Sequence, residues 1–134
     1  MASEGTQTRE AAWLELDAQL ERLAAEREQY LQVFEAAAQA YLITDAEGTL
    51  LDVNGAAVDI LQQRKRDLRG RPFASVVAFD QRSAFRASLR GLADLPGGAG
   101  SFNTILVAAG TRLEIALSAR VMPGGICWRL REVS

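Results

Sequence analysis

Residues 41–61, YLITDAEGTLLDVNGAAVDIL, constrain the fold more than any other stretch of the chain. Two short apolar runs, 41–44, which is rich in aromatic and β-branched residues, and 49–53, flank the polar turn Asp-Ala-Glu-Gly, which ends at Gly48. Such runs favour strands, and glycine reaches the positive φ values that tight turns require. We predict a β-hairpin over residues 41–53.

A helix is expected directly after this hairpin. Asn54 has the side chain of a helix N-cap, and Ala57, Ile60 and Leu61 follow at the i, i+3, i+4 spacing of one helical face. A hairpin that leads into a capped helix needs an apolar core on one side.

The composition indicates which broad class of protein this is. The 134 residues suffice for one domain with one appended element, and 24% charged with 49% hydrophobic residues is ordinary for a soluble globular protein. There is no long apolar run and no leader pattern, so we expect a cytoplasmic protein without a membrane span. The absence of histidine removes the commonest metal ligand, and we predict no metal site.

The first 39 residues differ from the rest. They hold eight acidic residues and three arginines, whereas the remainder is net basic. We predict a disordered tail over 1–8, a helix over 9–39 and a domain over 40–134.

This helix carries apolar residues at heptad a and d spacing, which predicts a coiled-coil homodimer. Arg27 occupies one a position, where it weakens a long dimer and favours one register. The alternative is an amphipathic helix that folds back onto its own domain. The predicted seam comprises Trp13, Leu16, Leu20, Leu23, Tyr30 and Phe34, with Ala37 continuing the spacing.

A basic cluster over residues 62–71, QQRKRDLRGR, raises the question of nucleic-acid binding. The net charge is slightly negative and no aromatic residue is interleaved for base stacking, so we predict a solvated connector ending at Gly70 and no nucleic-acid partner.

An inward-packing turn is predicted over 73–77, followed by a helix over 80–92 with Asp80 as its N-cap. Phe85, Leu89 and Leu92 form its apolar stripe, and its basic face holds Arg82, Arg86 and Arg90. Residues 96–100, PGGAG, predict a loop; no Lys-Ser/Thr follows, which excludes a P-loop.

The last third alternates apolar and polar residues over 101–107, 112–120 and 126–130, which predicts three strands. With the early hairpin they make a five-stranded antiparallel sheet with helices on one face. The opposite face is mixed, and either faces solvent or carries the N-terminal helix. The predicted class is α+β, preceded by a long amphipathic helix.

Three patterns together resemble a PAS sensor domain: Asp45-x-x-Gly48, Leu51-x-Val53-Asn54-x-Ala56-Ala57 and Leu68-Arg69-Gly70-Arg71. The resemblance spans about residues 33–134. It implies that the first and last strands are adjacent at the sheet centre, and that a ligand pocket lies between the sheet and the helix from Asp80. The implied lining is Phe85, Leu89, Phe102, Thr104, Ile115, Leu117, Ile126 and Trp128. The alternative is that these residues simply fill the core.

The resemblance also implies a signal relay and an output region. Arg131-Glu132-Val133-Ser134 resembles the motif with which these domains hand over to a following helix, so the relay residues are Asp45, Arg131, Glu132 and Ser134. A downstream effector domain, such as a kinase, cyclase or DNA-binding part, is expected in the full-length protein.

The cofactor stays unknown. Without histidine there is no His-ligated haem, and without an Asn-Cys-Arg segment there is no cysteinyl-flavin adduct. A non-covalent flavin or a small apolar ligand remains. The single cysteine, Cys127, is read as a small buried hydrophobic residue.

No catalytic residue is predicted. The acidic residues Asp45, Asp52, Glu114 and Glu132 are expected at turns, strand ends and the surface, so their presence needs no catalytic role. No nucleophile elbow is present in the sequence. The predicted function is therefore sensory or regulatory, with a ligand-free dimerisation or protein-interaction module as the alternative.

Overall fold

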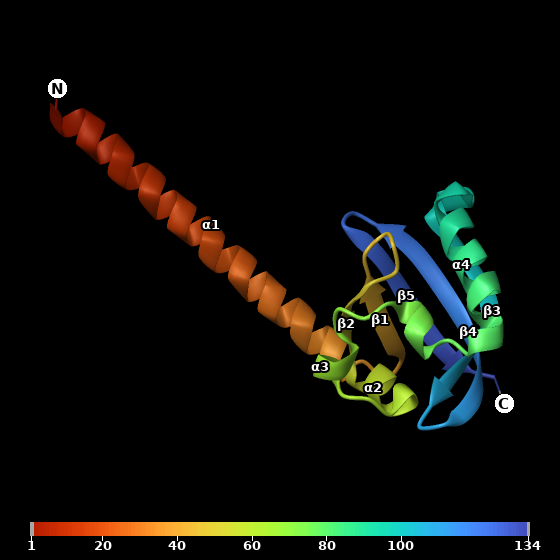
Figure 1. Ribbon diagram of the computed structural model, residues 1–134. Helices are drawn as coiled ribbons and strands as arrows, with labels where there is room; N and C mark the ends of the chain where they lie inside the picture. The colour runs from red at the N-terminus through yellow and green to blue at the C-terminus, as the bar shows by residue number, and fades with distance from the viewer. Residues whose placement is uncertain (1, 134) are drawn as a thin grey trace. The chain divides into compact units, whose positions relative to one another are not determined.

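The computed structural model describes residues 2–133 (Figure 1). The chain divides into two compact units, Met1–Phe34 and Glu35–Ser134. The first unit is formed by most of one long helix, and the second contains a sheet with shorter helices.

Helix α1 spans Ala2–Ala36. It begins before Arg9, so the described part of the predicted disordered tail, residues 2–8, is helical. Once a helix is nucleated, each further residue adds one hydrogen bond, and the helix extends through residues that would not start one. The helix ends before the predicted residue 39, and Ala37 lies outside it. The Asn54 amide binds the carbonyl of Gln39 at 2.8 Å, which directs the chain into the sheet.

In the described residues the sheet has five strands in the order β2-β1-β5-β4-β3, all antiparallel (Figure 1). The strands are β1 Ala40–Thr44, β2 Leu50–Val53, β3 Ala99–Ala108, β4 Thr111–Met122 and β5 Gly125–Glu132. The predicted fold class is confirmed, and the first and last strands are adjacent as expected. The last three strands are longer than predicted; for example, pairing of Ala99 with Arg120 starts β3 inside the expected loop.

The hairpin and the cap form as predicted. The Asp45 carboxylate accepts hydrogen bonds from the amides of Glu47 and Thr49 at 3.0 and 2.8 Å, and Gly48 has a φ of 91°. The Asn54 side-chain oxygen accepts from the amide of Ala57 at 3.0 Å, which caps α2. These local bonds define where the hairpin turns and where α2 starts.

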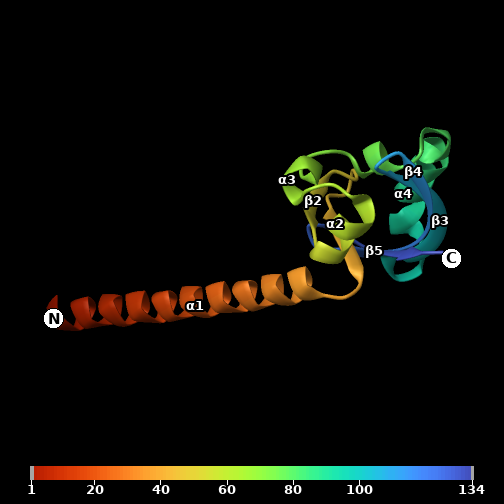
Figure 2. The same ribbon diagram turned by 90° about the horizontal axis from the view of Figure 1, so that it is seen from below.

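The segment between β2 and β3 is helical and covers one face of the sheet (Figure 2). It contains the α-helices α2 Gly55–Leu61, α3 Lys65–Leu68 and α4 Arg82–Gly91, and the 3₁₀ turns η1 Phe73–Val76, η2 Phe79–Gln81, η3 Leu92–Asp94 and η4 Pro96–Gly98. The inward turn after residue 72 and the connector ending at Gly70, which has a φ of 82°, agree with prediction.

The predicted cap of α4 is wrong. Asp80 lies in η2, and α4 begins at Arg82 with no side-chain cap on Gln81. Asp80 instead forms a bidentate ion pair with Arg112 at 3.0 and 3.2 Å, and this hydrogen-bonded guanidinium lowers the pKa of Asp80. Arg82, expected on a solvent-facing basic side, donates from Nε to the carbonyl of Val77 at 3.1 Å.

The core lies between the helices and the inner face of the sheet. It is built from the apolar residues of alternating strand positions and from the helical segment, as the predicted stripes indicate. The largest fully buried side chains are Trp128, Phe73, Phe85, Leu42, Leu50, Leu61, Leu68, Leu92, Leu106, Ile115, Leu117 and Val53.

Candidate functional site

Three buried aromatic rings, Trp128, Phe73 and Phe85, pack in the core, and the half-buried Phe102 joins them at its edge. The Trp128 indole on β5 lies 5.0 Å from the Phe73 ring, 5.7 Å from the Phe85 ring and 6.1 Å from the Phe102 ring, centroid to centroid. Phe73 and Phe85 are 4.9 Å apart. These separations are those of favourable aromatic pairs, so the four rings pack as one cluster.

The indole is also tied to the β1–β2 turn. Trp128 Nε1 donates to the Thr44 hydroxyl at 2.9 Å, and both residues are 0% exposed. The same hydroxyl donates to the carbonyl of Asp45 at 2.9 Å. A chain of two hydrogen bonds therefore runs from the aromatic cluster to the first residue of the turn.

The structure brings the predicted pocket residues together on the inner side of the sheet. Five of them belong to the buried core, Thr104 is buried, and Leu89 and Phe102 are half-buried at its edge. The sequence prediction omitted Phe73, although it lies in the inward-packing turn that the sequence analysis identified. Their role as a ligand pocket stays a prediction.

A groove opens beside this cluster, between the β1–β2 turn and α4. We call it the α4 groove; its volume is about 470 Å³. Two arginines of the predicted basic face of α4 line it, a role that helical periodicity alone did not indicate. Its lining residues are Ala46, Glu47, Gly48, Pro72, Ala74, Phe85, Arg86, Leu89 and Arg90.

The predicted relay residues lie at two ends of the central strands. Asp45 holds the turn after β1 through its carboxylate, as described above. Arg131 pairs with Ala116 and Glu132 with Ile115 in the β4–β5 register, and both side chains are exposed at the end of β5. Ser134 lies outside the described residues. Their role in a relay stays a prediction.

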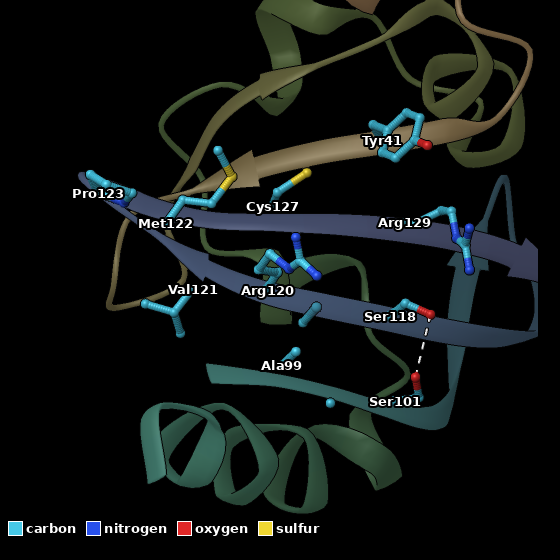
Figure 3. Close-up of a pocket in the computed structure, with 12 residues that line it drawn as sticks. Tyr41, Ala99, Ser101, Ser118, Arg120, Val121, Met122, Pro123, Cys127 and Arg129 are labelled. Atoms are coloured by element: carbon cyan, nitrogen blue, oxygen red, sulfur yellow. Dashed lines mark hydrogen bonds between the residues drawn. The ribbon is translucent and has the colours of Figure 1, made fainter. Parts of the chain in front are cut away.

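The outer face of the sheet carries a wide surface groove of about 860 Å³ (Figure 3). Arg120 of β4, and Cys127 and Arg129 of β5, lie on it (Figure 3). Cys127 was expected to be buried, but it is half-buried because its strand position faces outward, opposite Trp128. Partial burial raises the pKa of its thiol, and the Arg120 charge offsets part of this effect.

Several members of the basic cluster are paired. Lys65 Nζ lies 3.0 Å from Asp52 and also pairs with Glu35, while Arg69 binds Asp52 at 3.2 Å. Burial, together with the neighbouring Arg69 charge, lowers the pKa of Lys65. These ion pairs give Lys65 and Arg69 a structural role in joining α3 to β2.

Within residues 2–133 no helix is long and apolar enough to cross a membrane. Over the same part of the chain, no group of three or more acidic or cysteine side chains is arranged to hold a metal ion.

Comparisons with known proteins agree with this architecture. The family model described as "PAS domain" matches residues 28–95. Among solved structures, the PAS domain of an HTR-like protein from Haloarcula marismortui has a TM-score of 0.72 at 15% identity, covering 87% of this chain and 99% of that one.

A domain of a sensory box sensor histidine kinase/response regulator from Geobacter sulfurreducens has a TM-score of 0.68 at 27% identity, covering 81% of this chain and 96% of that one. A PAS domain of a LuxR-family transcriptional regulator from Burkholderia thailandensis, solved with ethanol, has a TM-score of 0.62 at 19% identity, with coverages of 78% and 96%. A comparison with curated proteins found no match. The family match and the Geobacter relative, at 27% identity, support a sensory or regulatory role. The chain belongs to the PAS domain family.

Proposed function

We propose that this chain is the sensory or regulatory module of a cytoplasmic signalling protein, that it dimerises through α1, and that it relays a change in its core to an output region. The observation that carries the proposal is the uncovered apolar stripe of α1. Its predicted seam residues Trp13, Leu20 and Leu23 are 67%, 55% and 61% exposed.

An exposed stripe of this kind is unfavourable for a helix in water. Leu16 and Tyr30, from the same heptad positions, are 44% and 52% exposed. Each large apolar side chain contributes about 1.5–3 kcal/mol when fully buried, so pairing two such helices gains free energy at the exposed apolar a and d positions. The seam residue Phe34 is only 7% exposed and adds little to this gain. A second copy of the same helix is the simplest partner with matching spacing. Arg27 interrupts the seam and favours a single register.

The core and the chain termini of the sheet domain are linked through its two central strands. β1 follows α1, and β5, which pairs with β1, carries Trp128 toward the core and ends at Glu132. The Trp128–Thr44–Asp45 hydrogen bonds join the core to the turn between β1 and β2. We propose that a ligand shifts the population between two dimer packings. Such a shift requires that the ligand bind the two packings with different affinities.

The relatives support the output region and the ligand. The Geobacter domain belongs to a sensor histidine kinase/response regulator, and the Burkholderia domain was solved with ethanol. We propose a downstream effector domain and a small apolar ligand by analogy with these proteins. We propose no catalytic activity for this module, since Asp45 and Asp52 already serve the turn and the ion pairs described above.

The second candidate is a ligand-free dimerisation or protein-interaction module. The packing of the aromatic cluster favours it, because the rings of Trp128, Phe73 and Phe85 pack directly on one another, with centroids 4.9–5.7 Å apart, among the residues implied as the pocket lining. A ligand bound to the purified protein would distinguish the sensor from this alternative.

The double substitution Leu20→Lys with Leu23→Lys tests the dimer. Light scattering of the full chain is expected to change from a dimer to a monomer, because two unpaired charges at neighbouring d and a positions weaken association by roughly 100-fold or more. The matched control is Leu14→Lys with Ala25→Lys, which adds the same charges to α1 outside the seam and leaves the dimer intact. A dimer in the Leu20/Leu23 variant would show that the seam is not the interface.

A further inference from the structure

The floor and wall of the α4 groove are apolar. Phe85 and Ala74 are buried at its base, and Leu89 is half-buried beside them. Gly48 forms part of the wall: a Cβ atom there would lie 2.9 Å from Leu89 Cδ2, and its φ of 91° favours glycine. Glycine therefore keeps the turn close to α4 while leaving the groove open.

The rim of the groove is positively charged. Arg86 and Arg90 are exposed, lie one helical turn apart on α4 and both line the groove. Among the described residues neither guanidinium forms an ion pair, in contrast to Arg112, Arg64 and Arg69. Glu47 supplies one carboxylate on the opposite side, which leaves the rim net positive.

We propose that the α4 groove binds a small carboxylate with an apolar chain. The two guanidiniums hold the carboxylate at the rim, since their planar donors match its two oxygens. The apolar chain lies on Leu89, Pro72 and the Phe85 ring. Its volume is within the range of small-molecule sites. This proposal deepens the ligand-sensing part of the proposed function and rests on it, but it does not depend on the dimer.

Occupation of the groove is expected to reach the core. Phe85 is both the base of the groove and a member of the aromatic cluster, 5.7 Å from Trp128. On the other wall, the turn containing Glu47 is joined to Trp128 through Asp45 and Thr44. A chain lying against Phe85 therefore changes the surroundings of the Trp128 indole.

This coupling supplies the readout. The full chain with Trp13→Phe retains Trp128 as its one tryptophan, and its fluorescence is titrated with octanoate and with octanol at neutral pH. The two probes share an apolar chain and differ in charge. We expect saturable binding of octanoate, with octanol roughly tenfold weaker because it lacks the charge-assisted hydrogen bonds.

The substitutions Arg86→Gln with Arg90→Gln are expected to weaken octanoate roughly tenfold and to leave octanol unchanged. Arg66→Gln, an exposed arginine of α3 outside the groove, is the matched control and leaves both affinities unchanged. The proposal is overturned if octanoate produces no saturable change, if octanol binds as tightly as octanoate, or if the double glutamine variant binds octanoate like its parent. None of these results bears on the dimer, which is tested separately by light scattering.

Discussion

Replacing Gly125 with alanine is expected to destabilise the sheet domain by about 3 kcal/mol. Gly125 opens β5 beside the end of β1, and a Cβ atom at this position would lie 2.2 Å from the Thr44 carbonyl oxygen. The obstacle is backbone rather than a flexible side chain, so it can be relieved only by separating the two strands. Thr44 pairs with Ile126 in this register, and the separation would also strain the Trp128–Thr44 hydrogen bond.

Urea unfolding followed by circular dichroism measures the effect. The control is Gly91→Ala, because a Cβ atom at Gly91 meets nothing within 4 Å and its φ of −84° suits alanine. We expect that variant to be as stable as the parent or slightly more stable, since alanine favours the helix. If Gly125→Ala unfolds at the same urea concentration as Gly91→Ala, the close packing of β1 on β5 is not as described.

Replacing Trp128 with alanine is expected to cost about 3–5 kcal/mol, enough to unfold much of a domain of this size. The substitution removes the ring that contacts Phe73, Phe85 and Phe102, and it leaves a cavity that these rings cannot close without moving. It also removes the donor that binds the buried Thr44 hydroxyl.

Phe79→Ala is the control for this prediction, because Phe79 is 84% exposed and contacts the guanidinium of Arg82 over its ring. We expect its free energy of unfolding to change by less than about 1 kcal/mol. Thermal unfolding monitored by circular dichroism compares the two variants. Equal losses of stability would mean that the aromatic cluster does not organise the core.

The parts of the fold that depend on local chemistry could be predicted from the sequence. The turn at Asp45–Gly48 and the cap at Asn54 are formed by residues within four positions of each other, as their hydrogen bonds show. The apolar alternation of the last three strands likewise identified the inner face. Periodicity reports which face is buried, and this was enough to obtain the class of fold.

The interactions that the sequence did not predict join distant residues. Asp80 has a side chain that often caps helices, yet its carboxylate binds Arg112 of β4 instead. The two residues are separated by 32 positions in the sequence. Gln62 takes the left-handed conformation at the end of α2 with a φ of 56°, although glycine is the usual residue there. Neither outcome can be read from local propensity.

The candidate site shows the same limit. Strand alternation placed Trp128 on the inner face, but the Thr44 hydroxyl that binds it is 84 residues away. Apolar pocket linings and apolar cores also have the same pattern in sequence, so the choice between them needs the geometry of the rings. The sequence placed the arginines of the α4 groove on one basic face of the helix. It did not show that two of them line a common groove.

Native mass spectrometry of the purified full chain, with an absorption spectrum of the same sample, tests the central claim most directly. The account predicts a dimer that carries additional non-covalent mass, and the size and absorption of that mass give the class of ligand. A monomer without added mass would contradict both the α1 dimer and ligand sensing. A dimer of bare chains would contradict the ligand and support the dimerisation module instead.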